Sequence, residues 1–155
     1  MLPSAGWAYH HDLLVGSGGP SHAGSCGPSH MSERSLPAPR LVIIVVDDDE
    51  AIRRSVGRFL RLCGHEVHAF ESSEAYLVHS RDADCAILDI QLPGIDGLEL
   101  ERRIRHEGLR LPVVFITAHD DRRTRTAVER TGRQLLVKPV DGDDLLAAIA
   151  NAIAA

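Results

Sequence analysis

Five short strand-like segments, each followed by a stretch with helical character, constrain the fold of this chain more than any other feature of its sequence. The segments are Leu41–Val46, Glu66–Phe70, Cys85–Asp89, Val113–Thr117 and Leu135–Val137. Continuous apolar strands are typical of sheets buried on both faces, and a helix after each strand returns the chain for a parallel neighbour. The alternation therefore predicts an α/β fold, a doubly wound (βα)5 parallel sheet of five strands.

The stretches between the strands carry the spacing and the capping residues of helices. Ile52, Val56 and Leu60 recur at helical spacing after the first strand, and Gly64 is expected to end that helix. The predicted helices cover residues 49–62, 73–80, 97–106, 120–131 and a final segment after residue 141. Asp96 and Asp141 are expected to cap the third and fifth helices.

The first 38 residues differ in composition from the rest of the chain. Residues 1–30 contain six glycines, three prolines, four histidines and a single charged residue. Such a sequence cannot form a packed core, so we expect a disordered leader or a tag over residues 1–38, with Met31 as a candidate native start. The folded domain is expected to cover residues 39–155.

The overall composition limits the classes of function. A chain of 155 residues is long enough for one domain, and its formal net charge of −5 argues against direct binding of nucleic acid. No apolar run approaches the length of a membrane span. The three cysteines have the spacing of neither a disulfide framework nor a metal site. We therefore expect a cytoplasmic protein that does not associate with a membrane.

Carboxylates follow two of the five strands directly. Asp47 and Asp48 come after the first strand, and Asp89 ends the third. The carboxyl ends of parallel strands meet at one edge of the sheet, where ligands of such folds bind. Three carboxylates at one edge repel one another unless a cation compensates, and Mg²⁺ is the cation that prefers such oxygen ligands. The pattern predicts a magnesium site.

The fourth and fifth strands end in a hydroxyl and an ammonium group. Thr117 ends the fourth strand, and Lys138 follows the fifth. Lys138 is the only lysine among 17 basic residues, an imbalance that a GC-rich coding bias explains for the other 16. A nucleophilic carboxylate, a metal ion, a cationic clamp and a hydroxyl donor are together the groups that phosphoryl transfer requires.

Four motifs at these strand ends resemble those of the receiver domain of bacterial two-component response regulators, over about residues 40–155. The motifs are V-V-D-D-D-E (45–50), L-D-I-Q-L-P-G-I-D-G (88–97), F-I-T-A (115–118) and L-V-K-P (136–139). The resemblance implies a flavodoxin-like sheet with the strand order 2-1-3-4-5. It also implies a protein that catalyses only its own phosphorylation and dephosphorylation and is not a conventional enzyme.

The resemblance assigns a role to each residue at the strand ends. Asp89 is the implied phosphoacceptor, which takes a phosphoryl group from a sensor histidine kinase and acts as a switch. Thr117 and Lys138 are expected to bind the transferred group, and Pro139 occupies the position of a cis-proline. The implied ligands of Mg²⁺ are Asp47, Asp48, Asp89 and the backbone carbonyl of Gln91. His119, two residues after Thr117, is a weaker candidate for a catalytic base.

The sequence departs from the receiver pattern in one segment. Leu135 stands where receivers usually carry an aromatic residue that reports on phosphorylation, and Arg133 stands where alanine is common. A degenerate receiver that binds a partner without phosphorylation is therefore one alternative. A downstream protein or a DNA-binding output partner and a homodimer are both compatible with the sequence.

A second alternative comes from another class of protein. A haloacid-dehalogenase-like phosphatase would use Asp47 as the nucleophile and Asp49 as the acid. This hypothesis leaves Asp89 without a role and requires Asp143 and Asp144 to act as an acidic pair at a strand end, whereas they are predicted to start a helix. Asp49 is more simply explained as a helix-start residue.

Overall fold

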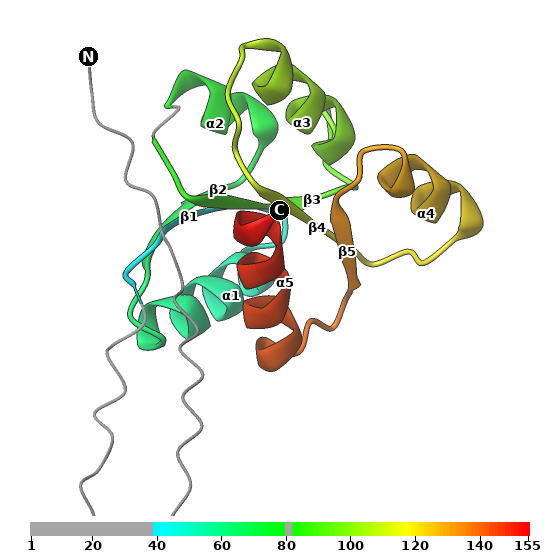
Figure 1. The fold of residues 1–155 in the computed structure, drawn as a ribbon. Helices are drawn as coiled ribbons and strands as arrows, with labels where there is room; N and C mark the ends of the chain where they lie inside the picture. Colours follow the sequence, from blue (N-terminus) through cyan, green and yellow to red (C-terminus); the bar gives the residue numbers. More distant parts are fainter. Residues whose placement is uncertain (1–38, 80–81) are drawn as a thin grey trace, which may run out of the picture. The chain divides into compact units, whose positions relative to one another are not determined.

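The computed structural model describes residues 39–79 and 82–155, in which five strands and five helices alternate (Figure 1). The strands are β1 (Val42–Val46), β2 (Glu66–Phe70), β3 (Cys85–Asp89), β4 (Val113–Thr117) and β5 (Gln134–Val137). The helices are α1 (Glu50–Leu62), α2 (Ser73–Val78), α3 (Gly97–His106), α4 (Arg122–Glu129) and α5 (Gly142–Ala154). The predicted leader, residues 1–38 with its candidate start at Met31, lies outside the described residues.

The sheet is parallel throughout, with the order β2-β1-β3-β4-β5, so the predicted doubly wound fold and the flavodoxin-like order are confirmed. Val46 of β1 is level with Leu88 of β3, and Thr117 of β4 is level with Val137 of β5. This register matters for function because the residues that follow these positions all emerge at the same edge of the sheet.

Two apolar layers enclose the sheet. Ile43 and Val45 of β1 face one layer with α1 and α5, and Ile44 and Val46 face the other with α2, α3 and α4. Figure 1 shows α1 and α5 together on one side of the sheet, with α2 and α3 on the other. The strand side chains alternate between the two layers because successive residues of a strand point to opposite faces.

Polar side chains fix the starts of the helices. Asp49, Ser72, Asp96 and Asp141 each accept a hydrogen bond from a backbone amide in the first turn of α1, α2, α3 and α5. Satisfying these amides, which have no partner within the helix, is the stabilising role of an N-cap. The predicted caps at residues 96 and 141 are confirmed. The fourth helix begins at Arg122, later than the predicted 120–131 segment, because Asp121 caps it, and it ends earlier, at Glu129.

A buried carboxylate joins α3 to the segment that enters β5. Glu101 of α3 is 1% exposed, and its Oε1 accepts a hydrogen bond from Arg133 Nε at 3.3 Å. Arg105, one turn later in α3, approaches Oε2 at 3.9 Å. The arginine at position 133, which departs from the receiver pattern, therefore compensates a charge on the face of α3 that packs inward.

Replacing Arg133 alone should destabilise the fold. Arg133→Ala leaves the buried Glu101 carboxylate with only the distant Arg105, and the loss of one partner of a buried ion pair costs about 3 kcal/mol. In the double variant Glu101→Leu, Arg133→Ala, an apolar side chain fills the same place, so most of that loss should be recovered. Urea denaturation of the three proteins measures both values, and equal stability of the single and double variants would contradict the expectation.

Candidate functional site

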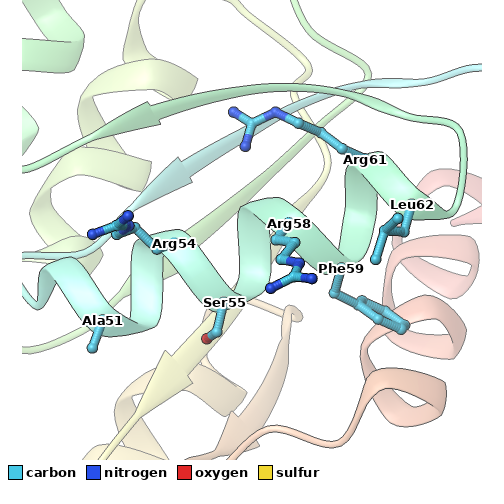
Figure 2. A pocket seen from close by; sticks show the side chains of 7 residues that line it. All are labelled: Ala51, Arg54, Ser55, Arg58, Phe59, Arg61 and Leu62. Carbon is cyan, nitrogen blue, oxygen red and sulfur yellow. The ribbon is translucent and has the colours of Figure 1, made fainter.

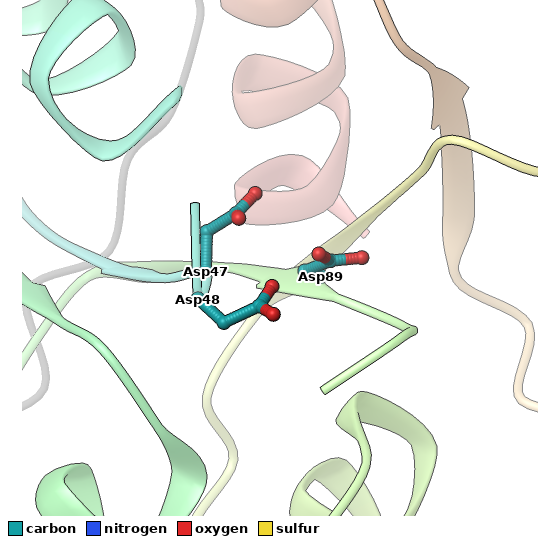
Figure 3. Close-up of side chains that lie close together, drawn as sticks. All are labelled: Asp47, Asp48 and Asp89. Atoms are coloured by element: carbon teal, nitrogen blue, oxygen red, sulfur yellow. The ribbon is translucent and has the colours of Figure 1, made fainter. Parts of the chain in front are cut away.

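Three aspartates converge at the carboxyl edge of the sheet (Figure 3). Asp47 and Asp48 follow β1, and Asp89 ends β3. One carboxylate oxygen from each lies within 4.8 Å of the others. Asp47 and Asp89 are 0% and 3% exposed, whereas Asp48 is open to solvent. The predicted clustering of these residues is therefore confirmed, and solvent can reach the cluster from the side of Asp48.

Lys138 bridges the two buried carboxylates. Its Nζ lies 2.7 Å from Asp47 Oδ2 and donates a hydrogen bond to Asp89 Oδ2 at 3.0 Å. Burial alone would lower the pKa of Lys138, but the two carboxylates outweigh it and raise that pKa above its usual value. The ammonium group is therefore charged at neutral pH. The backbone places it there, because Lys138 N donates to the carbonyl of Thr117 at 2.8 Å.

Opposing effects act on the pKa of the Asp89 carboxyl group. Burial raises the pKa of its carboxyl group, the hydrogen bonds from Lys138 and from the Gln91 amide lower it, and the charge of Asp47 raises it again. The net direction is upward. Burial is the largest of these effects, and additional positive charge at this edge would favour the ionised form of Asp89.

The donor set fits a divalent cation. Asp47 Oδ1 accepts a hydrogen bond from Asp49 N at 2.9 Å, and the buried Oδ2 forms the 2.7 Å ion pair with Lys138. Three carboxylates, one of them open to water, provide the hard oxygen ligands that Mg²⁺ prefers while it retains several water molecules. The acidic cluster is therefore typical of a Mg²⁺ site.

Thr117 is the last residue of β4, as the sequence predicts, and its side chain is buried. Its hydroxyl accepts a hydrogen bond from His119 N at 3.1 Å and donates one to His119 O at 3.2 Å. The side chain is thus engaged with its own loop. A ligand at the carboxylate cluster could recruit this hydroxyl only if the donation to the His119 carbonyl were given up.

A contact between His119 and Gln91 was not predicted from the sequence. His119 Nδ1 lies 2.5 Å from Gln91 Oε1, so the imidazole donates and the amide oxygen accepts. The pair joins the loop after β3 to the loop after β4. Each residue comes two positions after a strand-end site residue, Asp89 or Thr117, and that equal offset is the sequence signal that could have revealed their proximity.

The structure opposes the phosphatase hypothesis. Asp49, its proposed acid, accepts hydrogen bonds from Ala51 N and Ile52 N and so serves as the N-cap of α1. Asp143 and Asp144 lie in the first turn of α5 and not at a strand end. Neither arrangement leaves an acid facing the carboxylate cluster.

A separate hollow of about 630 Å³ lies along α1 (Figure 2). Three arginines line it together with Ser55 and Phe59, among other residues. These lining residues include no carboxylate and none of the strand-end residues discussed above. The hollow is therefore distinct from the carboxylate site.

The comparisons with known proteins agree with this site. A parallel sheet with acidic residues after β1 and at the end of β3 and a lysine after β5 defines the class of receiver folds. The family described as response regulator receiver domain matches residues 43–150, and the chain belongs to this family. The predicted resemblance is confirmed, and, as predicted, a receiver domain is not a conventional enzyme.

Curated relatives and solved structures give the same assignment. Response regulator protein TmoT from Ectopseudomonas mendocina is 31% identical over 135 residues, which cover 85% of this chain and 59% of that protein. Response regulator MprA from Mycolicibacterium vanbaalenii is 39% identical over 108 residues, or 68% of this chain and 47% of that protein. The chain therefore spans about half the length of the curated relatives it matches.

Among solved structures, the BeF3-activated DrrB receiver domain superposes with a TM-score of 0.68 at 25% identity, over 76% of this chain and all of that chain. The response regulator StyR superposes with a TM-score of 0.65 at 34% identity, over 73% of this chain and 59% of that chain.

In residues 39–79 and 82–155, no helix has the length and apolar character to cross a membrane.

Mg²⁺ should stabilise the fold through Asp48. At about 100 times its dissociation constant, a ligand that binds only the folded state stabilises it by about 2.7 kcal/mol. Asp48→Asn should remove most of this gain and leave the fold intact, because the side chain is exposed. Asp49→Asn is the matched control, since it removes the same charge one residue later and asparagine caps a helix as well as aspartate. Thermal melts with and without MgCl₂ measure the gain, and an unchanged gain in Asp48→Asn would contradict the assignment.

Proposed function

We propose that Asp89 accepts a phosphoryl group from a sensor histidine kinase in a Mg²⁺-dependent reaction, so that the domain acts as a phosphorylation switch. The observation that carries the proposal is the position of Lys138, whose ammonium group contacts the buried carboxylates of Asp47 and Asp89 at 2.7 and 3.0 Å. Membership of the receiver family, whose members work with a histidine kinase as partner, supports it.

The transfer is an in-line displacement at phosphorus. The Asp89 carboxylate donates an electron pair to form the new phosphorus–oxygen bond, and the phosphorus–nitrogen bond of the kinase phosphohistidine breaks, with its electrons returning to the imidazole. Asp47, Asp48, Asp89 and the backbone carbonyl of Gln91 would hold Mg²⁺. When bound, the ion would supply positive charge to the phosphoryl oxygens as they cross to Asp89.

Lys138 and Thr117 would act on the product. Phosphorylation converts the Asp89 carboxylate into an acyl phosphate, so the ammonium group of Lys138 can pair with a phosphoryl oxygen in its place. The Thr117 hydroxyl would donate to another oxygen after it releases the carbonyl of His119. Since that release frees the loop after β4, phosphorylation would be transmitted to the neighbouring α4.

His119 is the candidate for a positioned base in dephosphorylation. Its Nδ1 donates to Gln91, which leaves Nε2 as the nitrogen with a free lone pair in the neutral ring. A base must lie within hydrogen-bond reach of the water that it activates. A base must also be held in a fixed orientation, and the hydrogen bond to Gln91 would orient the ring over the edge of the site.

The output of the switch would not use an aromatic residue in β5. Leu135 stands at that position and packs partly buried against the layer that contains α3 and α4. Loop movement after Thr117 and contact with a downstream protein or a DNA-binding output partner would therefore carry the signal. Both a monomer and a homodimer are compatible with this mechanism.

We further propose that the receiver domain covers residues 39–155 and is cytoplasmic, preceded by a disordered leader or tag over residues 1–38, with Met31 as a candidate native start. The family match at residues 43–150 lies within this range. The composition of residues 1–38 differs from that of the rest of the chain. Cytoplasmic placement agrees with the three cysteines, which have no disulfide spacing.

Phosphotransfer tests the proposal directly. Acetyl phosphate and MgCl₂, or a phosphorylated histidine kinase, should add one phosphoryl group to Asp89. Asp89→Asn should lose this modification, and Asp49→Asn should keep it, because that residue caps α1. Intact-protein mass spectrometry with peptide mapping identifies the modified residue.

The other outcomes separate the alternatives. Multiple turnovers of acetyl phosphate that depend on Asp47 would support the phosphatase instead. The absence of any phosphorylation, with all available kinases and with acetyl phosphate, would support the degenerate receiver.

Lys138→Arg tests the second half of the mechanism. A planar guanidinium replaces a compact ammonium group with a different geometry, although the charge is kept. Asp89 should still be phosphorylated, but the structural response should be reduced. Proton–nitrogen spectra with and without beryllofluoride measure this response around Thr117 and α4. Full wild-type shifts in the arginine variant would show that any cation suffices at this position.

A further inference from the structure

The loop that joins β3 to α3 begins directly after Asp89 and contains Gln91. Its path therefore determines the position of Gln91 relative to the carboxylate cluster. Within the loop, the carbonyl of Ile90 accepts hydrogen bonds from Leu92 N at 3.2 Å and from Gly97 N at 3.1 Å. The amide of Gln91 donates to Asp89 Oδ1 at 3.0 Å. These bonds fix the two ends of the loop but not its central turn at Gly94 and Ile95.

A carboxylate from α2 holds that central turn. Ile95 N donates a hydrogen bond to Glu74 Oε1 at 3.0 Å, although the two residues are 21 positions apart. Gly94 has a φ of +78°, and a Cβ atom at this position would collide with Glu74 Oε1. The carboxylate therefore lies directly against the loop backbone, and the glycine makes this close approach feasible.

The contact is electrostatic and lies at the surface. The hydrogen bond from the Ile95 amide lowers the pKa of Glu74, so the side chain is ionised at neutral pH and accepts a charge-assisted bond. Glu74 is exposed and belongs to neither apolar layer. Its removal should therefore loosen the loop and leave the core unchanged.

Within the described residues, two side chains from outside β3 and this loop bond to the segment from Gln91 to Ile95, one at each end. His119 bonds to the side chain of Gln91, and Glu74 bonds to the backbone of Ile95. Across residues 39–79 and 82–155, Glu74 is the only side chain from outside β3 that hydrogen-bonds to the backbone of this loop. A backbone contact constrains the path of the chain more directly than a contact to a flexible side chain.

We propose that Glu74 is a positioning residue for the metal site: it holds the loop after β3 so that the carbonyl of Gln91 faces the carboxylate cluster. The inference rests on the proposed function, since it assumes that Mg²⁺ binds there through that carbonyl. Groups that orient metal ligands without touching the metal affect affinity by about 10-fold or more. Glu74 therefore acts on Mg²⁺ affinity and leaves the reactivity of Asp89 itself unchanged.

Three variants test the proposal. Glu74→Ala removes the acceptor, and Glu74→Gln keeps an oxygen acceptor while it removes the charge. Glu71→Ala is the control for charge, because Glu71 is also exposed and forms no hydrogen bond or ion pair within the described residues. Titration calorimetry with MgCl₂ gives the affinity, and acetyl phosphate at increasing MgCl₂ gives the half-saturating concentration and the maximal rate.

Glu74→Ala should weaken Mg²⁺ binding by about 10-fold and raise the half-saturating MgCl₂ concentration equally. Its maximal phosphorylation rate should stay near that of the wild type. Glu74→Gln and Glu71→Ala should both remain within about 2-fold of the wild type, because glutamine keeps an oxygen acceptor for Ile95 N and Glu71 forms no hydrogen bond to the loop within the described residues. In Glu74→Ala, the amide of Ile95 loses its acceptor and should exchange its hydrogen faster. This measurement can be made without metal.

The outcomes separate two failures. Wild-type Mg²⁺ affinity in Glu74→Ala would overturn the inference and leave the proposed function intact. An equal loss in Glu74→Gln and Glu71→Ala would also overturn it, because long-range charge would then explain the effect. A wild-type protein that neither binds Mg²⁺ nor becomes phosphorylated would overturn the proposed function and, with it, this inference.

Discussion

The ammonium group of Lys138 between Asp47 and Asp89 is the interaction on which the arrangement of this site depends. Two carboxylates that are almost fully buried repel each other, and a compact cation within 3.0 Å of both makes their proximity tolerable. Burial still keeps the pKa of Asp89 above its ordinary value. Because Asp48 adds a third carboxylate, the cluster carries more negative charge than one ammonium group offsets, which suits a divalent cation.

The parallel sheet makes this contact possible. Lys138 and Asp89 are 49 positions apart in sequence, and only the order β1-β3-β4-β5 with its register brings both to one edge. The strands that carry them are held between two apolar layers, so their ends have little freedom to shift. A rigid frame with polar groups only at its edge is the usual way in which such folds position ligands.

Further side-chain contacts surround the site. Arg133 neutralises the buried Glu101, which explains a departure from the receiver pattern as one half of an ion pair. Glu74 and His119 attach to the loop after β3 from opposite sides. Of these side chains, Glu74 and His119 are the two that contact the loop containing Gln91.

The sequence by itself determined the fold and the membership of the site, because periodicity records burial and strand-end residues of a parallel sheet must share one edge. Asp47, Asp89, Thr117 and Lys138 were identified on that basis. The tertiary structure decided which groups are in contact. These contacts are the Glu101–Arg133 ion pair, the Gln91–His119 hydrogen bond and the hydrogen bond from Ile95 N to Glu74. Each joins residues more than 20 positions apart through side-chain and loop geometry that no local pattern records, and only the Gln91–His119 contact has a sequence signal, the shared two-residue offset from a strand end.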